Sequence, residues 1–161
     1  MSKSTNFLTI GALVAFAAVH TASAQVTQTV TFQVTAINQI SVTGAPSLDI
    51  NTATAGSAPT SVTAAANSWS VTTNQSTAMI TASIPSDMPA GLTLSANLIA
   101  PAGATSAGLI ALGTTAVNVV TGITKLNSAA LGLTYQLDAT AAAGVVTSST
   151  RVVTYTITGG V

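Results

Sequence analysis

The sequence predicts an all-β protein, folded as an antiparallel β-sandwich of about seven to nine strands. Three observations predict this class: apolar residues alternate with Thr, Ser or Gln in short runs, Gly and Pro separate the runs, and threonine is abundant. Threonine favours strands because its branched β-carbon fits a pleated sheet better than a helix. The simplest organisation is a single sandwich domain over residues 25–161, preceded by a separate segment over residues 1–24.

Residues 1–24 have the features of a secretory signal peptide. Lys3 supplies a positive charge, Phe7–Val19 is an apolar core, and Ala22 and Ala24 form a small-x-small cleavage motif. The apolar core is shorter than the roughly 20 residues that a membrane-spanning helix needs, which disfavours a retained transmembrane anchor. We therefore expect an N-terminal signal helix that is removed, and an exported protein that is periplasmic, at the cell surface or extracellular.

The clearest strand pattern in the chain covers Val26–Ala36. Its odd positions hold Thr or Gln, and its apolar residues fall on even positions: Val26, Val30, Phe32, Val34 and Ala36. This period of two is typical of a half-buried strand. The phase breaks at Ile37-Asn38 and resumes at Ile40, as a β-bulge or a crossing between sheets would produce.

Further strands are expected at short spacing, separated by turn signals such as Gly44-Ala45-Pro46 and Pro101-Ala102-Gly103. They cover Ser47–Asn51, Trp69–Thr73, Ala78–Ile84, Leu92–Leu98, Leu109–Leu112, Ala116–Val120, Leu133–Ala139 and Arg151–Thr158. The Ala-rich stretch Thr52–Asn67 is expected to be a loop, with a short helical turn as the alternative. Many short alternating strands in one domain are typical of an Ig-like sandwich.

Charged residues make up only 4% of the chain, against roughly a quarter in ordinary soluble domains. There are three Lys or Arg, so the chain lacks a basic surface for nucleic acid. There is no cysteine, which excludes disulfides, thiolate metal sites and a cysteine nucleophile.

Catalysis is not expected, because the residue types that it needs are scarce. The chain has no Glu, its one His (His20) lies in the signal segment, and three aspartates remain: Asp49, Asp87 and Asp138. Their spacing is unlike that of a calcium loop. We therefore predict no catalytic residue, no metal and no cofactor.

Two other motifs carry little functional signal. Asn74-Gln75-Ser76 matches the glycosylation sequon, a three-residue pattern that arises often by chance. Trp69 could stack on a sugar, but a lone Trp in a sandwich is more often an anchor of the core.

The two terminal strands are the candidate surfaces for assembly. Soluble monomers guard sheet edges with Lys, Pro or inward charges, and these strands carry no Lys. An unguarded strand can complete the sheet of a neighbouring copy through main-chain hydrogen bonds, and the alternative is ordinary pairing within its own sandwich. The candidate assembly residues are Val26, Val30, Phe32, Val34, Val153, Tyr155 and Ile157.

The export signal, the alternating stretch VTQTVTFQVTAINQISV and the closing VVTYTIT resemble those of bacterial fimbrial or surface-fibre subunits. The resemblance implies a non-enzymatic structural subunit of a pilus, biofilm matrix or cell-surface coat. Its partners would be copies of itself or another surface or matrix protein. The alternative function is that of a monomeric, secreted Ig-like module for adhesion or binding, which recognises a glycan or a protein.

Overall fold

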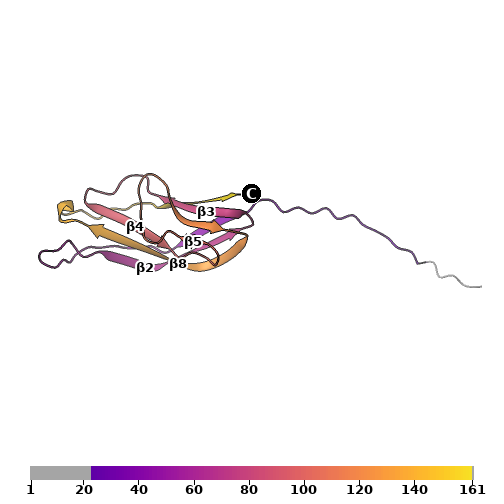
Figure 1. Cartoon of the computed structure of the whole chain (residues 1–161), viewed down its shortest axis with the longest axis horizontal. Coiled ribbons are helices and arrows are strands. Elements are labelled where there is room, and N and C mark those ends of the chain that lie inside the picture. The colour runs from indigo at the N-terminus through magenta and orange to yellow at the C-terminus, as the bar shows by residue number, and fades with distance from the viewer. Residues whose placement is uncertain (1–22, 161) are drawn as a thin grey trace, which may run out of the picture. The chain divides into compact units, whose positions relative to one another are not determined.

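The computed structural model describes residues 23–160, apart from the side chain of Ala66. The chain divides into two units, residues 1–33 and 34–161. In the second unit, two antiparallel sheets pack against each other as a β-sandwich, so the predicted all-β fold class is confirmed (Figure 1). The predicted signal helix and Ala22 lie outside the described residues.

The first sheet has five strands in the order β1-β2-β8-β4-β6, and each pair of neighbours is antiparallel. Its strands are β1 (Asn38–Thr43), β2 (Val62–Thr73), β8 (Leu126–Ala139), β4 (Leu92–Leu98) and β6 (Ile110–Ala111). The second sheet has the order β5-β7-β3-β9, also antiparallel. Its strands are β5 (Thr105–Ser106), β7 (Val117–Ile123), β3 (Ser76–Ser83) and β9 (Thr154–Gly160). A 3₁₀ turn, Ala141–Ala143, follows β8.

The core lies between the inner faces of the two sheets. In β3, the fully buried residues Ala78, Ile80 and Ala82 alternate with more exposed ones, as the sequence pattern predicts. Trp69 of β2 faces them with 1% of its surface exposed, and its Nε1 donates a hydrogen bond to the Ile99 carbonyl at 3.2 Å. The interpretation of Trp69 as a core anchor is therefore confirmed.

Three predicted elements differ from the structure. Val26–Ala36 is not a half-buried strand of the sandwich, because the first strand begins at Asn38. Ser47–Asn51 forms no strand. In contrast, Val62–Asn67, part of the predicted loop Thr52–Asn67, belongs to β2 and pairs with β8.

The limits of β1 have local causes at both of its ends. At Asn74-Gln75 the chain passes from β2 in the first sheet to β3 in the second, so residues before Asn38 have no β2 residue beside them. At the other end, Gly44 has φ +116°, and a Cβ there would collide with the side chain of Asn67. The first sheet therefore includes the six residues of β1, which follow the break in alternation, and none of the alternating residues before it.

Candidate functional site

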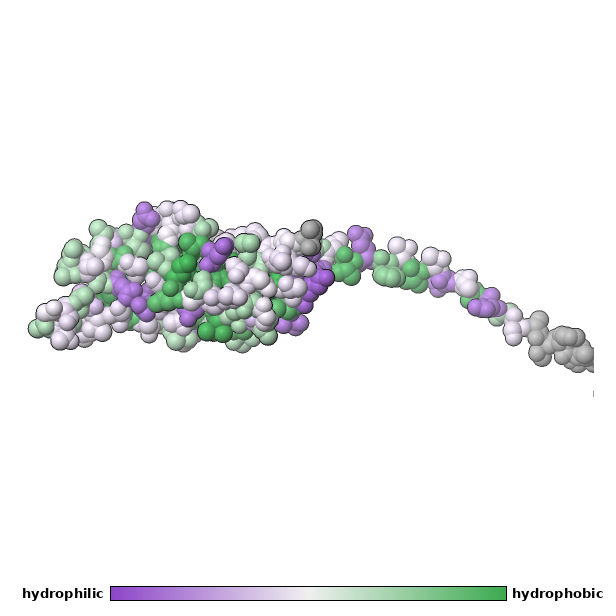
Figure 2. Space-filling model, in the orientation of Figure 1, coloured by the Kyte–Doolittle hydropathy of each residue, from purple (hydrophilic) through white to green (hydrophobic). Residues whose placement is uncertain are grey.

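The N-terminal segment, defined as Val26–Ala36, is extended and exposed. Figure 2 shows hydrophobic and hydrophilic residues alternating along it. The exposed fraction is 92% for Val26, 72% for Val30, 90% for Phe32 and 77% for Val34. Residues 23–37 belong to no strand, which leaves the strongest strand pattern of the chain unpaired.

The stem, defined as Thr35–Ile37, joins this segment to β1 and is bonded to Asn74 in the turn between β2 and β3. The Ile37 N–H donates to Asn74 Oδ1 at 2.8 Å, and Asn74 Nδ2 donates to the Thr35 carbonyl at 2.7 Å. The Asn74 backbone N–H donates to the Ile37 carbonyl at 3.2 Å. Asn74 therefore bonds to the stem directly after the end of β2. Its side-chain amide nitrogen is occupied by the hydrogen bond to the Thr35 carbonyl.

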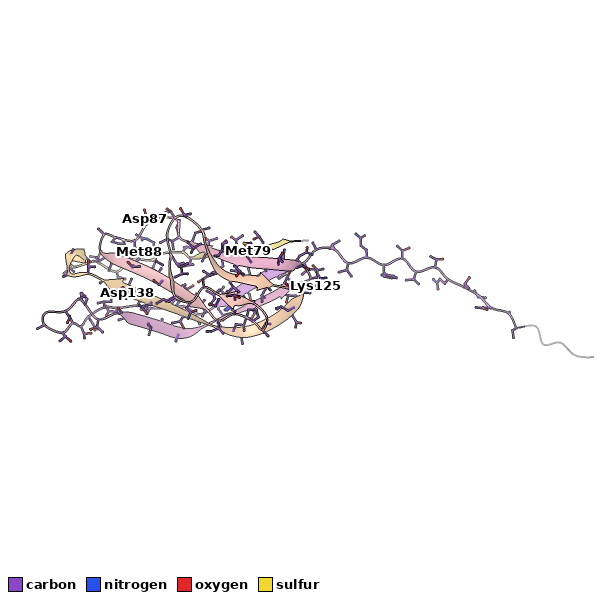
Figure 3. The ribbon with its side chains drawn as sticks, viewed as in Figure 1. Met79, Asp87, Met88, Lys125 and Asp138 are labelled. Carbon is purple, nitrogen blue, oxygen red and sulfur yellow. The ribbon has the colours of Figure 1, made fainter. Side chains whose placement is uncertain are left out.

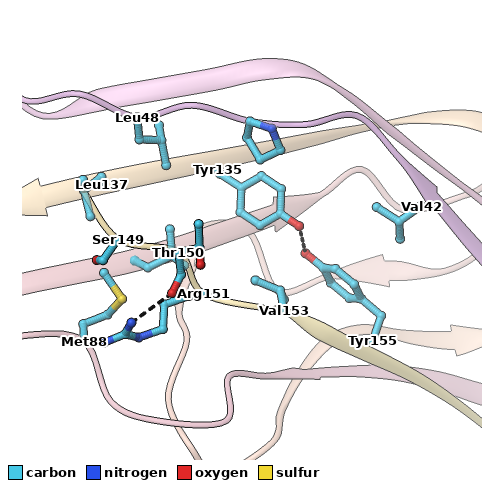
Figure 4. A pocket seen from close by; sticks show the side chains of 12 residues that line it. Val42, Leu48, Met88, Tyr135, Leu137, Ser149, Thr150, Arg151, Val153 and Tyr155 are labelled. Carbon is cyan, nitrogen blue, oxygen red and sulfur yellow. Dashed lines mark hydrogen bonds between the residues drawn. The ribbon is translucent and has the colours of Figure 1, made fainter.

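A groove opens into the core on the side of the sandwich where β1 and β9 form the sheet edges. We call it the edge groove; its volume is about 380 Å³ (Figure 4). Its apolar lining includes Val42, Leu48, Met88, Leu94, Leu137 and Val153. A second, more polar hollow of about 830 Å³ shares Leu48, Met88 and Leu137 with it, so the recess continues along the molecule.

The groove is flanked by two sheet edges whose outer sides carry no partner strand among residues 23–160. β1 pairs only with β2, and β9 pairs only with β3. The two edges touch near Gly159, where a Cβ would collide with the side chain of Asn38. The recess therefore lies toward the other end of β9, beside Val153 and Tyr155.

Of the predicted assembly residues, Val153, Tyr155 and Ile157 lie on one face, half-buried against the core. Val153 precedes β9, whereas Tyr155 and Ile157 lie within it. The other four, Val26, Val30, Phe32 and Val34, lie in the exposed N-terminal segment. The predicted assembly residues therefore fall into two groups: four lie in the exposed N-terminal segment, and three lie on or beside the edge strand β9.

Two tyrosines join the sheets inside the groove. The Tyr155 hydroxyl of β9 donates to the Tyr135 hydroxyl of β8 at 2.9 Å (Figure 4). Burial raises the pKa of Tyr135 above its ordinary value, although the hydrogen bond from Tyr155 opposes the shift. Burial, the donated hydrogen bond and the nearby Tyr135 all raise the pKa of Tyr155. Both hydroxyls therefore remain neutral well into the alkaline range.

We expect the free energy of unfolding to fall as the pH rises above about 10, the ordinary pKa of tyrosine. In the unfolded chain both tyrosines ionise there, whereas the raised pKa values keep them protonated in the fold, so unfolding releases protons. The slope for each tyrosine approaches about 1.4 kcal/mol per pH unit. Urea denaturation across this range measures it. The double variant Tyr135→Phe/Tyr155→Phe should lose this dependence, and an unchanged slope would contradict the assignment.

Arg151 is the charged residue of the groove lining. Its Nη1 donates to the Thr150 carbonyl at 2.9 Å and its Nη2 to the Asp87 carbonyl at 3.2 Å. Its Nε is buried and has no hydrogen-bond partner among the described residues. A buried donor of this kind is costly unless it is paired, so an incoming carbonyl or amide oxygen would be stabilised beside it.

The aspartates do not converge on a site. Asp138 accepts hydrogen bonds from Ser61 and Gln136, and Asp49 accepts one from Asn51. Asp87, Asp138 and Lys125 lie apart in Figure 3. Within residues 23–160, no three His, Cys, Asp or Glu side chains gather as metal ligands would. None of the helices in that part of the chain is long and apolar enough to cross a membrane.

Comparisons with protein-family models, curated proteins and solved structures found no match. Sequence reasoning missed Leu48, Met88 and Arg151 of the groove, because residues so far apart in the chain carry no common pattern. The contacts of Asn74 with the stem were not predicted either, because the sequence indicated Asn74 only as part of a glycosylation sequon.

Proposed function

We propose that the protein is an exported, non-enzymatic structural subunit of a pilus or fibre, a biofilm matrix or a cell-surface coat. Successive copies associate by β-strand addition: residues 26–34 of the N-terminal segment of one copy lie along the open edge of the next, with their apolar side chains in the edge groove. The observation that carries the proposal is the exposed, alternating and uncharged segment Val26–Ala36, which belongs to no strand.

The segment and the groove are complementary in chemistry. The segment carries no charged residue and alternates apolar with Thr or Gln side chains, and the groove combines apolar side chains with the polar Ser149, Thr150 and Arg151. In an extended strand, alternate residues lie about 7 Å apart on one face, so neighbouring even-numbered side chains of the segment enter the recess together. Its backbone N–H and C=O groups would bond to the free edge of β9, which offers unpaired groups of the same kind.

The surrounding surface also favours association. β1 and β9 contain no charged residue, so like-charge repulsion does not oppose strand pairing along them. Asp87 and Asp138, which lie apart in Figure 3, do not form the side-by-side pair that acid–base chemistry needs, and this supports a role without catalysis.

The alternative is a monomeric binding module, in which a glycan or a foreign peptide is the ligand. Trp69 offers no stacking surface for a sugar, because it is 1% exposed. This burial favours the structural role over recognition of a glycan at Trp69.

We expect the exported, processed protein to form filaments as its concentration rises. Each added copy buries the exposed apolar residues of one segment, and burial of each Val or Phe side chain contributes about 1.5–3 kcal/mol. Size-exclusion chromatography and negative-stain electron microscopy measure the assembly. A sharp monomer at high concentration, without filaments, would overturn the structural role and favour the binding module.

A further inference from the structure

We propose that Asn74 stiffens the joint between successive subunits by holding the stem Thr35–Ile37 in one conformation. The inference rests on the proposed assembly, and it assigns to the turn between β2 and β3 a role in the mechanics of the filament. Asn74 is a positioning residue here, since it contacts the stem and is not part of the groove.

The hydrogen bonds of Asn74 reach both ends of the stem, Thr35 and Ile37. Its side chain accepts from the Ile37 N–H at 2.8 Å and donates to the Thr35 carbonyl at 2.7 Å, and its backbone N–H donates to the Ile37 carbonyl at 3.2 Å. One asparagine thus engages three polar groups of the stem backbone, one on Thr35 and two on Ile37. A glutamine or aspartate cannot reproduce the set, since the first is longer and the second has no donor.

Asn74 is itself held in place by its neighbours. Gln75 Nε2 donates to Asn74 Oδ1 at 2.7 Å, and the Gln75 carbonyl accepts from the Lys125 N–H at 3.0 Å. One residue earlier, Thr73 Oγ1 donates to Asn38 Oδ1 at 2.6 Å and accepts from the Gln75 N–H at 3.0 Å. The stem is therefore anchored to a turn that is cross-linked to both β1 and the β7–β8 turn.

The stem lies directly before β1, between the N-terminal segment and the sandwich. In the proposed filament, residues 26–34 lie in the neighbouring copy, and β1 of their own sandwich begins at Asn38. The stem is then the covalent connection between two folded bodies. Each free residue would add two soft backbone dihedrals to that connection, whereas a bonded stem leaves the joint without a flexible linker.

The test compares filaments of the exported, processed protein with those of Asn74→Ala, which removes both side-chain bonds. Asn74→Asp is a second variant, which keeps the acceptor for the Ile37 N–H and loses the donor to Thr35. Asn127→Ala is the matched control: Asn127 is an exposed asparagine at the start of β8, on the strand next to β2, and its side chain makes none of the hydrogen bonds found among residues 23–160. Filament persistence length is measured from electron micrographs, and hydrogen exchange follows the Ile37 N–H.

We expect Asn74→Ala and Asn74→Asp to form filaments whose persistence length is lower by about twofold or more, because the stem gains the freedom of a short linker. The Ile37 N–H should exchange faster in Asn74→Ala, while the melting temperature stays close to that of the Asn127→Ala control. Filaments of unchanged stiffness in both Asn74 variants would overturn the inference and leave the proposed assembly standing. Absence of filaments from the unsubstituted protein would instead overturn the assembly, and the role of Asn74 with it.

Discussion

Deletion of residues 25–36 will abolish filament formation and leave a folded, monomeric sandwich. The deleted residues contribute no strand to either sheet, and the core consists of residues from Trp69 to Tyr135, so the fold does not depend on them. What is lost is the proposed donor, with its exposed Val and Phe side chains. Size-exclusion chromatography and electron microscopy report the change, and circular dichroism reports the retained strands.

A synthetic peptide of residues 25–36 tests the same contact from the other side, because it replaces the deleted segment. It should bind to the truncated protein, which stays soluble, and its affinity is measured. A Phe32→Asp peptide should bind at least about tenfold more weakly, because it loses a large apolar side chain and the carboxylate must be desolvated to enter the groove. Gln33→Asp introduces the same charge on the opposite face of the strand and should bind much like the original. Identical fibres from the truncated protein, or equal affinities for the three peptides, would contradict strand addition through this segment.

Truncation of Trp69 will have the largest effect on stability. Trp69→Ala should lower the free energy of unfolding by about 3–5 kcal/mol, because it removes a buried aromatic side chain and leaves a cavity. That loss is a large part of the roughly 5–15 kcal/mol that stabilises a typical domain. The hydrogen bond from Trp69 Nε1 to the Ile99 carbonyl is lost as well. Urea denaturation followed by circular dichroism measures the change.

Val152→Ala is the control, since Val152 is 68% exposed and its truncation should change stability by less than about 0.5 kcal/mol. Trp69→Phe keeps a buried ring and should preserve assembly. If Trp69→Ala proved as stable as the unsubstituted protein, Trp69 would not anchor the core, and a role in ligand binding would need to be considered again.

The alternating patterns predicted the sandwich because one face of most strands meets the core. Leu92–Leu98 is β4 as expected, and the alternation of Ala78, Ile80 and Ala82 matches their burial. The prediction for Val26–Ala36 was wrong about pairing for a physical reason. A period of two shows that one face is suited to burial, but it does not show which strand covers it. Here β2 leaves the first sheet at Asn74, before it reaches those residues.

Two other features depended on tertiary context. Ala-rich Val62–Asn67 has low intrinsic preference for strands, yet it pairs with Tyr135 and Leu137 of β8, and that partner decides its conformation. The edge groove brings together Leu48, Met88 and Arg151, which share no motif. The candidate segment was therefore readable from the sequence, whereas the surface that is proposed to receive it was not.

The N-terminal segment and the edge groove are different parts of one chain, so the proposed contact between copies is heterologous, and in a filament it repeats from copy to copy without closing into a ring. A polymer built in this way has a polarity: one end presents an empty groove and the other a free segment. A chain without residues 25–36 keeps its groove, so it could add only to the end with the free segment. Because it has no segment of its own to insert into another copy, no further copy could add at that end. Small amounts of it would therefore act as a terminator at one end of each polymer, while the opposite end continued to elongate.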